Sequence, residues 1–308
     1  MARVLTVGAA QLGPIEKSEN RASVVTRMLD LMNAAKRKSC DLVVFPELAL
    51  TTFFPRWYMT DQTEIDQWFE AEMPNHDTEP LFDMARQSNM AFHLGYAELC
   101  TKSDQTHHYN SAILVDKDGE IAAKYRKIHL PGHDEFDPDR DFQHLEKRYF
   151  ETGDLGFPVF KALNSTLGMC ICNDRRWPET FRMLGLQGVE LVMLGYNTPV
   201  HYPRAPEHDH LQDFHNHLSV QAGAYQNGTW VAATAKAGCE ENCDMIGGSC
   251  IVSPTGEIVA QCETLDDELI TWNCDLDLCQ TIQKNIFNFE LHREPENYGL
   301  IARSTKGN

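Results

Sequence analysis

The segment GMCICNDRRWPE, Gly168–Glu179, decides how the rest of this chain is interpreted. An apolar run ends at Cys172, and Pro178 then marks the start of a helix, because proline is favoured in the first helical turn. In parallel α/β proteins, ligands bind outside the carboxyl ends of the strands. Cys172 therefore stands where a reactive side chain is expected, whereas Cys170 lies within the strand and is predicted to be buried and inert.

A cysteine attacks only as its thiolate, and at a pKa of about 8.5 only a few per cent of a free thiol is ionised at neutral pH. A catalytic cysteine therefore needs a nearby base or cation. Without such neighbours, Cys170 and Cys172 are both best interpreted as core residues, because cysteine is among the most often buried residue types. The sequence around Cys172 must therefore be searched for a partner.

Two other apolar segments end in a charged residue. LVVFPE ends at Glu47, and KYRKIHL carries Lys127 at the end of a hairpin strand. Such residues are usually solvated strand ends. If their strands and that of Cys172 belong to one sheet, however, the three side chains can converge on one site. Glu47 can then accept the thiol proton, and the Lys127 ammonium can stabilise an oxyanion.

Strands and helices alternate along the chain, which predicts an α/β fold. Strands are expected at 2–11, 40–47, 90–99, 166–172, 189–197 and 229–237, and helices at 18–38, 79–89, 178–188 and 208–227. A hairpin with Asp118-Gly119 at its turn is predicted over 111–130, and a second hairpin after 237. An irregular stretch at 131–156 interrupts the pattern, and loops of that length are often functional.

Two segments in the first half of the chain each resemble a segment in the second half. ILVDKDGEIAAK at 113–124 resembles IVSPTGEIVAQ at 251–261, and DLVVFPE resembles ELVMLGYN, each after a helix. No Ser/Gly-rich linker separates the halves. We therefore predict one domain, 1–308, with pseudo-repeated halves. The tail from about 287 to 308 has little periodicity, so we expect it either to cross a subunit interface or to be mobile.

Composition excludes several classes of protein. A chain of 308 residues can bury a substantial core, and a net charge of −18 argues against a nucleic-acid partner. The N-terminus resembles a first strand rather than a signal peptide, and no apolar run approaches the roughly 18 residues of a membrane span. Several of the ten cysteines lie inside apolar runs. We expect a reduced, cytoplasmic enzyme without a membrane partner.

FPE with Glu47, YRKIHL with Lys127 and CNDRRWPE with Cys172 resemble, in this order, the three signatures of the nitrilase superfamily of carbon–nitrogen hydrolases. Longer runs resemble its N-carbamoyl-D-amino-acid hydrolases: PELALTTFFPRW, YRKIHLPGH, FQHLEKRYFE, GYNTP and NFELHR. The resemblance implies an α-β-β-α sandwich, a Glu–Lys–Cys triad, and no metal or cofactor. It also implies a homo-oligomer, a dimer or tetramer, that hydrolyses N-carbamoyl-D-amino acids to the D-amino acid, carbon dioxide and ammonia.

The resemblance also implies roles for the residues around the nucleophile. Cys172 attacks the ureido carbon, and the backbone N–H of Asn173 joins Lys127 in holding the oxyanion. Arg175 and Arg176 hold the substrate carboxylate, because a planar guanidinium can donate two parallel hydrogen bonds. Arg175 is the more distinctive of the two arginines. Arg176 is equally consistent with an internal salt bridge, for example to the glutamate of WPE.

Three further residues enter the site by the same resemblance, Glu146, His129 and His144, and two more because they end the next strand, Asn197 and Thr198. The glutamate is expected to orient Lys127 or the substrate nitrogen, and the histidines to line the pocket. The last two are expected to bind ureido or carboxylate oxygens. Judged by residue type alone, they are an exposed loop acid, two structural histidines and a turn before Pro199.

Several alternatives stay open. With the same triad, the chain can be a thiol amidase, a β-ureidopropionase or a nitrilase, although Arg175 favours a substrate with a carboxylate near the scissile group, which a simple nitrile lacks. It can also be a non-catalytic binding protein with this fold, or a thiol–disulfide or metal protein. The histidine-rich segment HDHLQDFHNH lacks a recognised zinc spacing, so we interpret it as a polar helix face or an interface.

Overall fold

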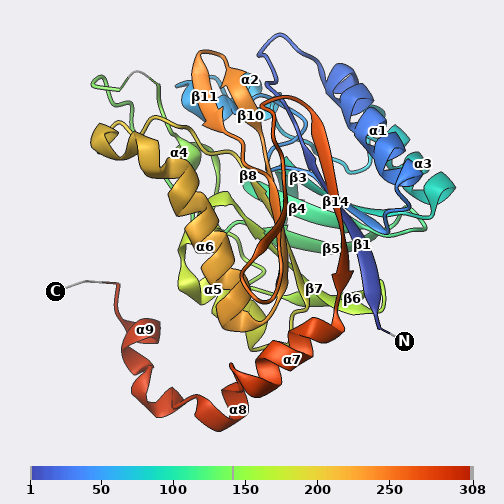
Figure 1. Cartoon of the computed structure of the whole chain (residues 1–308). Coiled ribbons are helices and arrows are strands. Elements are labelled where there is room, and N and C mark those ends of the chain that lie inside the picture. Colours follow the sequence, from blue (N-terminus) through green and yellow to red (C-terminus); the bar gives the residue numbers. More distant parts are fainter. Residues whose placement is uncertain (1, 141, 306–308) are drawn as a thin grey trace.

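The computed structural model describes residues 2–140 and 142–305, which fold into two six-stranded sheets lying face to face (Figure 1). The first sheet has the order β14-β1-β2-β3-β4-β5, and the second has the order β13-β12-β9-β8-β7-β6. The first contains β1 (Val4–Gln11), β2 (Leu42–Val44), β3 (Ala91–Lys102), β4 (Gln105–Val115), β5 (Ile121–Arg126) and β14 (Glu268–Asp275). The second contains β6 (Val159–Ala162), β7 (Ser165–Ile171), β8 (Leu191–Tyr196), β9 (Trp230–Ala235), β12 (Cys250–Val252) and β13 (Ile258–Gln261).

Helices cover the outer face of each sheet, so the layers run α-β-β-α, as predicted (Figure 1). Helices α1 (Arg21–Arg37) and α3 (Glu79–Ser88) pair over the first sheet. Helices α5 (Pro178–Gly185) and α6 (Gln212–Asn227) pair over the second sheet. The remaining α-helices are α2 (Gln62–Asp66), α4 (Glu146–Tyr149), α7 (Asp277–Asn285), α8 (Phe289–His292) and α9 (Gly299–Arg303).

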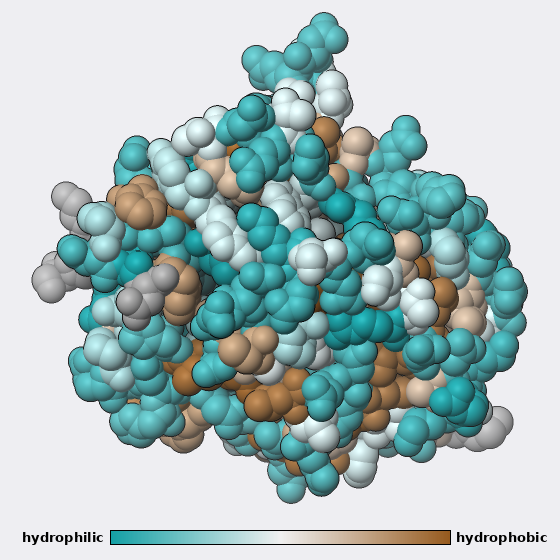
Figure 2. Space-filling view, turned by 90° about the horizontal axis from the view of Figure 1, so that it is seen from above, coloured by the Kyte–Doolittle hydropathy of each residue, from teal (hydrophilic) through white to brown (hydrophobic). Residues whose placement is uncertain are grey.

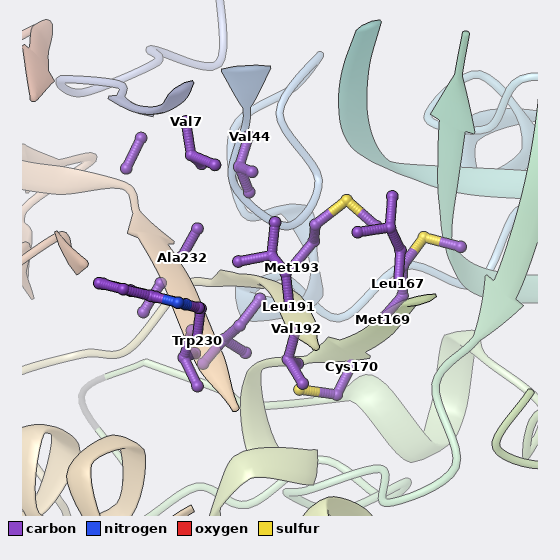
Figure 3. Packing of buried hydrophobic residues seen from close by; sticks show 14 of the residues in the cluster. Val7, Val44, Leu167, Met169, Cys170, Leu191, Val192, Met193, Trp230 and Ala232 are labelled. Carbon is purple, nitrogen blue, oxygen red and sulfur yellow. The ribbon is translucent and has the colours of Figure 1, made fainter. Parts of the chain in front are cut away.

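The inner faces of the two sheets form one apolar core. Val7 and Val44 of the first sheet pack in the same cluster as Leu167, Met193 and Ala232 of the second sheet (Figure 3). Burying such side chains stabilises the sandwich by about 25 cal/mol for each Å² of apolar surface removed from water. The core therefore holds the two sheets in a fixed relation, and this relation positions the residues at the strand ends.

The helical period read from the sequence places one face of α1 against the first sheet. Its buried residues are Val24, Val25, Met28, Leu31, Met32 and Ala35, which are the apolar positions of the predicted helix. The side chain of Asn20 accepts a hydrogen bond from the Ser23 N–H and so caps the helix.

The two halves share one strand topology, which confirms the predicted pseudo-repeat. Strands β1, β2 and β3 are mutually parallel and continue into the antiparallel strands β4 and β5. Strands β7, β8 and β9 are also parallel and continue into the antiparallel strands β12 and β13. The carboxyl ends of the parallel strands therefore meet at one edge of the sandwich.

Some segments depart from the expected pattern. A hairpin of β10 (Ala237–Glu240) and β11 (Cys243–Ile246) is inserted between β9 and β12. The predicted helix from 208 begins only at Gln212, after a 3-10 turn over Pro206–Leu211. The described part of the tail forms α8 and α9, which extend away from the sandwich (Figure 1). Within residues 2–140 and 142–305, no helix is long and apolar enough to cross a membrane.

Candidate active site

Glu47, Lys127 and Cys172 meet at the edge formed by the carboxyl ends of the strands. Glu47 follows β2, Lys127 comes directly after β5, and Cys172 comes directly after β7. The Nζ atom of Lys127 lies 2.7 Å from Glu47 Oε1, and both side chains are fully buried. The prediction of convergence on a single sheet was wrong in one respect. Strands β2 and β5 belong to the first sheet and β7 to the second, so the site lies between the sheets.

A second carboxylate, Glu146, binds the same ammonium group. Glu146 opens α4 in the long loop, and its Oε2 lies 2.5 Å from Lys127 Nζ. Asn110 Nδ2 donates to Glu47 Oε1 at 2.7 Å and lies 3.4 Å from Glu146 Oε2. The Glu146 Oε1 atom lies 3.2 Å from His144 Nε2. The lysine is thus held between two buried carboxylates that share an asparagine donor.

This arrangement raises the pKa of both the Lys127 ammonium and the Cys172 thiol, for different reasons. Burial lowers the pKa of Lys127, but Glu146 and Glu47 outweigh burial and raise it, so Lys127 stays protonated. Burial raises the pKa of Glu146, but Lys127 outweighs it and keeps that carboxyl ionised. Burial and the Glu47 charge raise the pKa of the Cys172 thiol despite Lys127 and Arg175. The resting sulfur is therefore protonated, and it needs a base before it can attack.

The backbone at the nucleophile and beside Glu47 adopts the left-handed region. The φ angle of Cys172 is 46°, and that of Leu48 is 44°. A non-glycine residue in this region costs on the order of 1 kcal/mol and persists only where surrounding contacts impose it. The turn places Cys172 at the start of a 3-10 helix, Cys172–Arg176, where the Sγ atom donates to the Asn197 carbonyl at 3.3 Å.

Asp174 anchors this turn to the end of β5. One carboxylate oxygen accepts from the Ile171 N–H at 3.0 Å and from the Tyr125 hydroxyl at 2.8 Å. The other accepts from the His129 N–H at 2.9 Å and lies 2.8 Å from His129 Nδ1. The His129 ring stacks on Trp177 and lines a neighbouring cavity, not the one that Cys172 lines. The structure thus places His129 as a support of the nucleophile turn, outside the predicted pocket.

A cavity of about 230 Å³ opens in front of Cys172. Seen from above, the molecule presents a mainly hydrophilic face with small, separate apolar areas (Figure 2). The lining of the cavity in front of Cys172 includes His133, Arg140, Phe142, His144, Cys172, Asn173, Arg176, Asn197, Thr198, His201, Tyr202 and Arg204. No aspartate or glutamate is among the described residues that line it. The cavity therefore favours an anionic ligand although the whole chain carries a charge of −18.

The two adjacent arginines have different surroundings. Arg175 is buried, and its donors bind Asn216 Oδ1 at 2.8 Å, the Cys172 carbonyl at 2.7 Å and Thr198 Oγ1 at 2.9 Å. Arg176 is exposed at the cavity wall and donates to Gln212 Oε1 at 3.1 Å. It forms no ion pair within the described residues. Arg176 is therefore the arginine placed to bind a ligand carboxylate, whereas the donors of Arg175 are used in hydrogen bonds within the protein.

The polar residues beside Cys172 serve the protein as well as the cavity. The Asn197 N–H donates to Glu47 Oε2 at 2.9 Å, and its Nδ2 donates to the Glu47 carbonyl at 3.0 Å. Asn197 therefore orients Glu47, rather than offering its amide to ligand oxygens as expected. Asn173 Nδ2 donates to the His129 carbonyl at 3.0 Å. The Asn173 backbone N–H lies in the first turn of the 3-10 helix, where donors have no acceptor inside the helix.

Two functional features escaped sequence reasoning. Asn110 lies inside β4, and nothing in its neighbourhood in the sequence marks it as a partner of the carboxylates. The tripeptide LGY, however, occurs at 94–96 and again at 194–196, at matching positions of β3 and β8. A Cβ atom on Gly95 or Gly195 would lie 2.5 Å from the Pro46 carbonyl oxygen or the Glu47 nitrogen, respectively. The repeated glycines thus let both sheets approach the backbone that carries Glu47.

We expect Gly195→Ala to destabilise the chain by about 1–3 kcal/mol, because the added methyl must displace the Glu47 backbone. The alkylation of Cys172 by iodoacetamide should slow by about tenfold as Glu47 moves away from it. Urea unfolding and mass spectrometry of the alkylated peptide measure the two effects. Gly8→Ala is the control, since the atom nearest its Cβ belongs to the movable Leu269 side chain, at 3.1 Å, and its other neighbours lie at ordinary contact distances of 3.5 Å or more. Equal alkylation rates in the wild type and Gly195→Ala would contradict this role.

Comparison with known proteins places the chain among well-defined relatives. A family model described as carbon-nitrogen hydrolase matches residues 6–284. A nitrilase of Pyrococcus abyssi is 30% identical over 260 residues, which cover 84% of this chain and 86% of the relative. An N-carbamoylputrescine amidase of Solanum lycopersicum is 27% identical over 316 residues, covering 97% and 95% of the two chains.

A solved structure shares the fold over almost the whole chain. The crystal structure of a carbon-nitrogen hydrolase from Helicobacter pylori superposes with a TM-score of 0.83 at 23% identity. The match covers 97% of this chain and 99% of that one. The two-sheet sandwich described above is therefore the architecture of that structure as well.

Proposed function

Because this chain belongs to the carbon–nitrogen hydrolase family, we propose that it hydrolyses N-carbamoyl-D-amino acids, with Cys172 as nucleophile and Glu47 as general base. Family membership makes it a hydrolase of carbon–nitrogen bonds. The observation that carries the finer proposal is the position of Arg176, exposed on the wall of the cavity that also contains the Cys172 thiol. The D configuration rests on the sequence resemblance.

In the first half of the reaction, Glu47 accepts the Cys172 proton as sulfur attacks the ureido carbon. The pKa of the thiol is raised, so the thiolate forms only as the proton leaves. The protonated Lys127 and the Asn173 N–H hold the oxyanion, and such donors are typically the largest source of rate enhancement in acyl transfer. Collapse of the intermediate breaks one carbon–nitrogen bond. Glu47 returns the proton to the departing nitrogen, and the carbonyl carbon stays bonded to sulfur.

In the second half, a water molecule attacks the carbon bound to Cys172 while Glu47 accepts a proton from that water. The carbon–sulfur bond breaks, and the sulfur leaves with the proton returned by Glu47. The released carbamic acid loses carbon dioxide. The overall products are one amine, one ammonia and one carbon dioxide for each water consumed. Glu146 supports both halves as the second carboxylate, beside Glu47, that pairs with Lys127.

The charges around the cavity favour a substrate carboxylate over a substrate amine. Arg140, Arg176 and Arg204 line the cavity, and no described acidic residue does. The protonated amine of N-carbamoylputrescine would find no described carboxylate on the cavity wall, because Asp137, which pairs with Arg140, does not line it, and an unpaired buried charge is costly. An α-carboxylate can instead accept hydrogen bonds from the Arg176 guanidinium. This contrast supports an N-carbamoyl amino acid rather than the substrate in the name of the Solanum lycopersicum relative.

We expect Arg176→Met to raise KM for an N-carbamoyl amino acid by about 10–100-fold, because a hydrogen bond to a charged group contributes about 1.5–3 kcal/mol. The kcat value should change much less, since Arg176 lies away from the Glu47–Lys127 pair. Steady-state ammonia release measures both constants. A simple N-alkylurea without a carboxylate serves as the matched substrate, and its kcat/KM should be unchanged. An equal loss for both substrates would contradict a carboxylate contact.

The decisive test of the function compares ammonia release from matched N-carbamoyl-D- and N-carbamoyl-L-amino acids. N-carbamoylputrescine, a simple amide and a nitrile complete the set. Rapid release from the D form alone supports the full proposal. Release from both enantiomers, or from the L form alone, retains the mechanism and overturns the stereochemical part. Activity on the amide or nitrile alone overturns the carbamoyl proposal in favour of an amidase or a nitrilase.

A further inference from the structure

A second buried ion cluster lies beside the candidate site and has no part in the mechanism above. It consists of Arg56, Lys236 and Glu240, which are all buried. Glu240 Oε1 accepts from Arg56 Nη2 at 2.8 Å, and Glu240 Oε2 accepts from Lys236 Nζ at 3.0 Å. The guanidinium also donates to the Glu240 carbonyl. Two cations and one carboxylate are thus removed from water together.

The side chains of this cluster form hydrogen bonds with the segment 51–56, which follows Glu47 in the chain. Glu240 Oε1 also accepts from the Phe53 N–H at 2.7 Å and from the Thr52 hydroxyl at 3.0 Å. Lys236 Nζ donates to the Thr51 carbonyl at 2.6 Å. Arg56 Nε donates to the Phe53 carbonyl at 3.1 Å. The chain from 51 to 56 is therefore bound through its own backbone, and it starts four residues after Glu47.

The same segment holds the loop that carries Glu146. The Leu145 N–H donates to the Pro55 carbonyl at 2.8 Å, and the Gln143 N–H donates to the Arg56 carbonyl at 3.3 Å. The ring of Phe53 meets the ring of His144 edge-on at 5.4 Å. Both carboxylates that hold Lys127 are therefore connected, through short stretches of backbone, to residues that Glu240 and Arg56 bind.

Glu240 also belongs to the hairpin that supports the opposite wall of the cavity. In its second strand, the Ile246 N–H donates to the Thr198 carbonyl at 2.9 Å. The Asp244 carbonyl accepts from the Val200 N–H at 2.7 Å. Thr198 lines the cavity on one side, and His144 lines it from the long loop. The β10–β11 hairpin therefore contacts both walls, and the ion cluster is its connection to the wall that carries Glu146.

We propose that Arg56 and Glu240 are positioning residues: their pairing ties the β10–β11 hairpin to the segments carrying Glu47 and Glu146 and so sets the geometry around Lys127. This inference rests on the proposed function, because the geometry concerned is that of the proposed nucleophile and base. Neither residue lines the cavity, so each acts through others. Their loss should therefore affect the chemical step more than substrate binding.

The test uses Glu240→Gln, Arg56→Met and the double variant in the full chain. Each single change should lower kcat by about 10²-fold, because displacements of about 1 Å in a catalytic site cost that much. KM for the N-carbamoyl amino acid should stay within about threefold, since Arg176 is untouched. The double variant should lose no more kcat than either single variant, because the two side chains form one link.

Arg3→Met is the matched control. It breaks ion pairs to Glu190 and Asp277 at the other end of the strands, so it lowers stability without reaching the site. Its kcat should stay within about twofold of the wild type. A fall in melting temperature with unchanged kcat in Glu240→Gln and Arg56→Met would overturn the proposal, as would equal kcat losses in Arg3→Met. If Glu240→Gln fails to fold, Arg56→Met carries the test, because it leaves Lys236 and Glu240 as a balanced pair.

A measurement made without substrate distinguishes a failure of this proposal from a failure of the proposed function. Iodoacetamide alkylation of Cys172, followed by mass spectrometry, reports on the thiol and its base whatever the substrate is. Alkylation slowed by about tenfold in both variants but not in Arg3→Met supports the positioning role even if no N-carbamoyl amino acid is hydrolysed. Alkylation at the wild-type rate in both variants overturns it even if the wild type is active.

Discussion

Cys172→Ala is expected to abolish hydrolysis, lowering kcat by at least about 10⁴-fold. Removing the nucleophile of a covalent mechanism costs on the order of 10⁴–10⁶, and the residual rate comes from the oxyanion donors alone. Fold and stability should change little, because the side chain loses one sulfur with its hydrogen bond to the Asn197 carbonyl and the long one, 3.8 Å, that it accepts from Arg175 Nη1. Ammonia release by the purified variant, with its thermal melting curve, is the measurement.

Cys170→Ala is the matched control for this variant. Cys170 lies two residues earlier in β7, is fully buried in the apolar core, and has a thiol pKa raised well above its usual value by burial. Its removal leaves a small void and a modest loss of stability, but the reaction rate should be retained. Loss of activity in Cys170→Ala with retention in Cys172→Ala would reverse the assignment of the nucleophile.

Lys127→Met is expected to lower kcat/KM by at least about 10³-fold and the free energy of unfolding by about 3–5 kcal/mol. The loss of rate follows from the loss of an oxyanion donor. The loss of stability follows because Glu47 and Glu146 are left buried and close together without their shared cation, and breaking a buried ion pair is costly. Steady-state kinetics and urea unfolding measure the two effects separately.

The pH dependence of stability should distinguish Lys127→Met from the wild type. In the wild type, the lowered pKa of Glu146 contributes stability above its ordinary value of 4.5 and loses it as the pH falls. In the variant, Lys127 no longer offsets the burial that raises the pKa of Glu146, so the variant gains stability relative to the wild type as the pH falls. The difference in unfolding free energy should therefore shrink between about pH 7 and pH 4.5.

Lys124→Met provides the comparison within the same segment of the chain, since Lys124 lies in β5 and Lys127 directly follows it. Lys124 lies three residues before Lys127 and pairs with Glu98 at 2.5 Å, but it is partly exposed. Burial raises the pKa of Glu98, yet hydrogen bonds from Arg126, Lys124 and Ser111 lower it to about 2, and Arg126 stays in place in the variant. Kinetics close to the wild type are expected. A rate loss similar to that of Lys127→Met would show that any lysine substitution in or next to β5 slows the reaction, and would contradict a specific role for Lys127.

The elements most securely predicted from the sequence are those with local signals. The apolar period of α1 and the strand-end positions of Glu47 and Cys172 depend on residues next to them in the chain, and the structure has them where expected. Asn110 and Glu240 had no such signal. Asn110 lies within a strand, and Glu240 within the β10–β11 hairpin. Their partners come from distant segments, so no local pattern marks them.

The α/β class, the two related halves and the order of the three charged or nucleophilic strand ends could all be predicted from the amino-acid sequence. Periodicity, turn residues and strand boundaries are properties of neighbouring residues, and these carried that information. The position of the site between two sheets, and the exposure of Arg176 rather than Arg175 to the cavity, depend on how distant segments pack together. Successive side chains of a 3-10 turn point about 120° apart, so the packing of the turn against Asn216 and Thr198 selects which arginine is exposed.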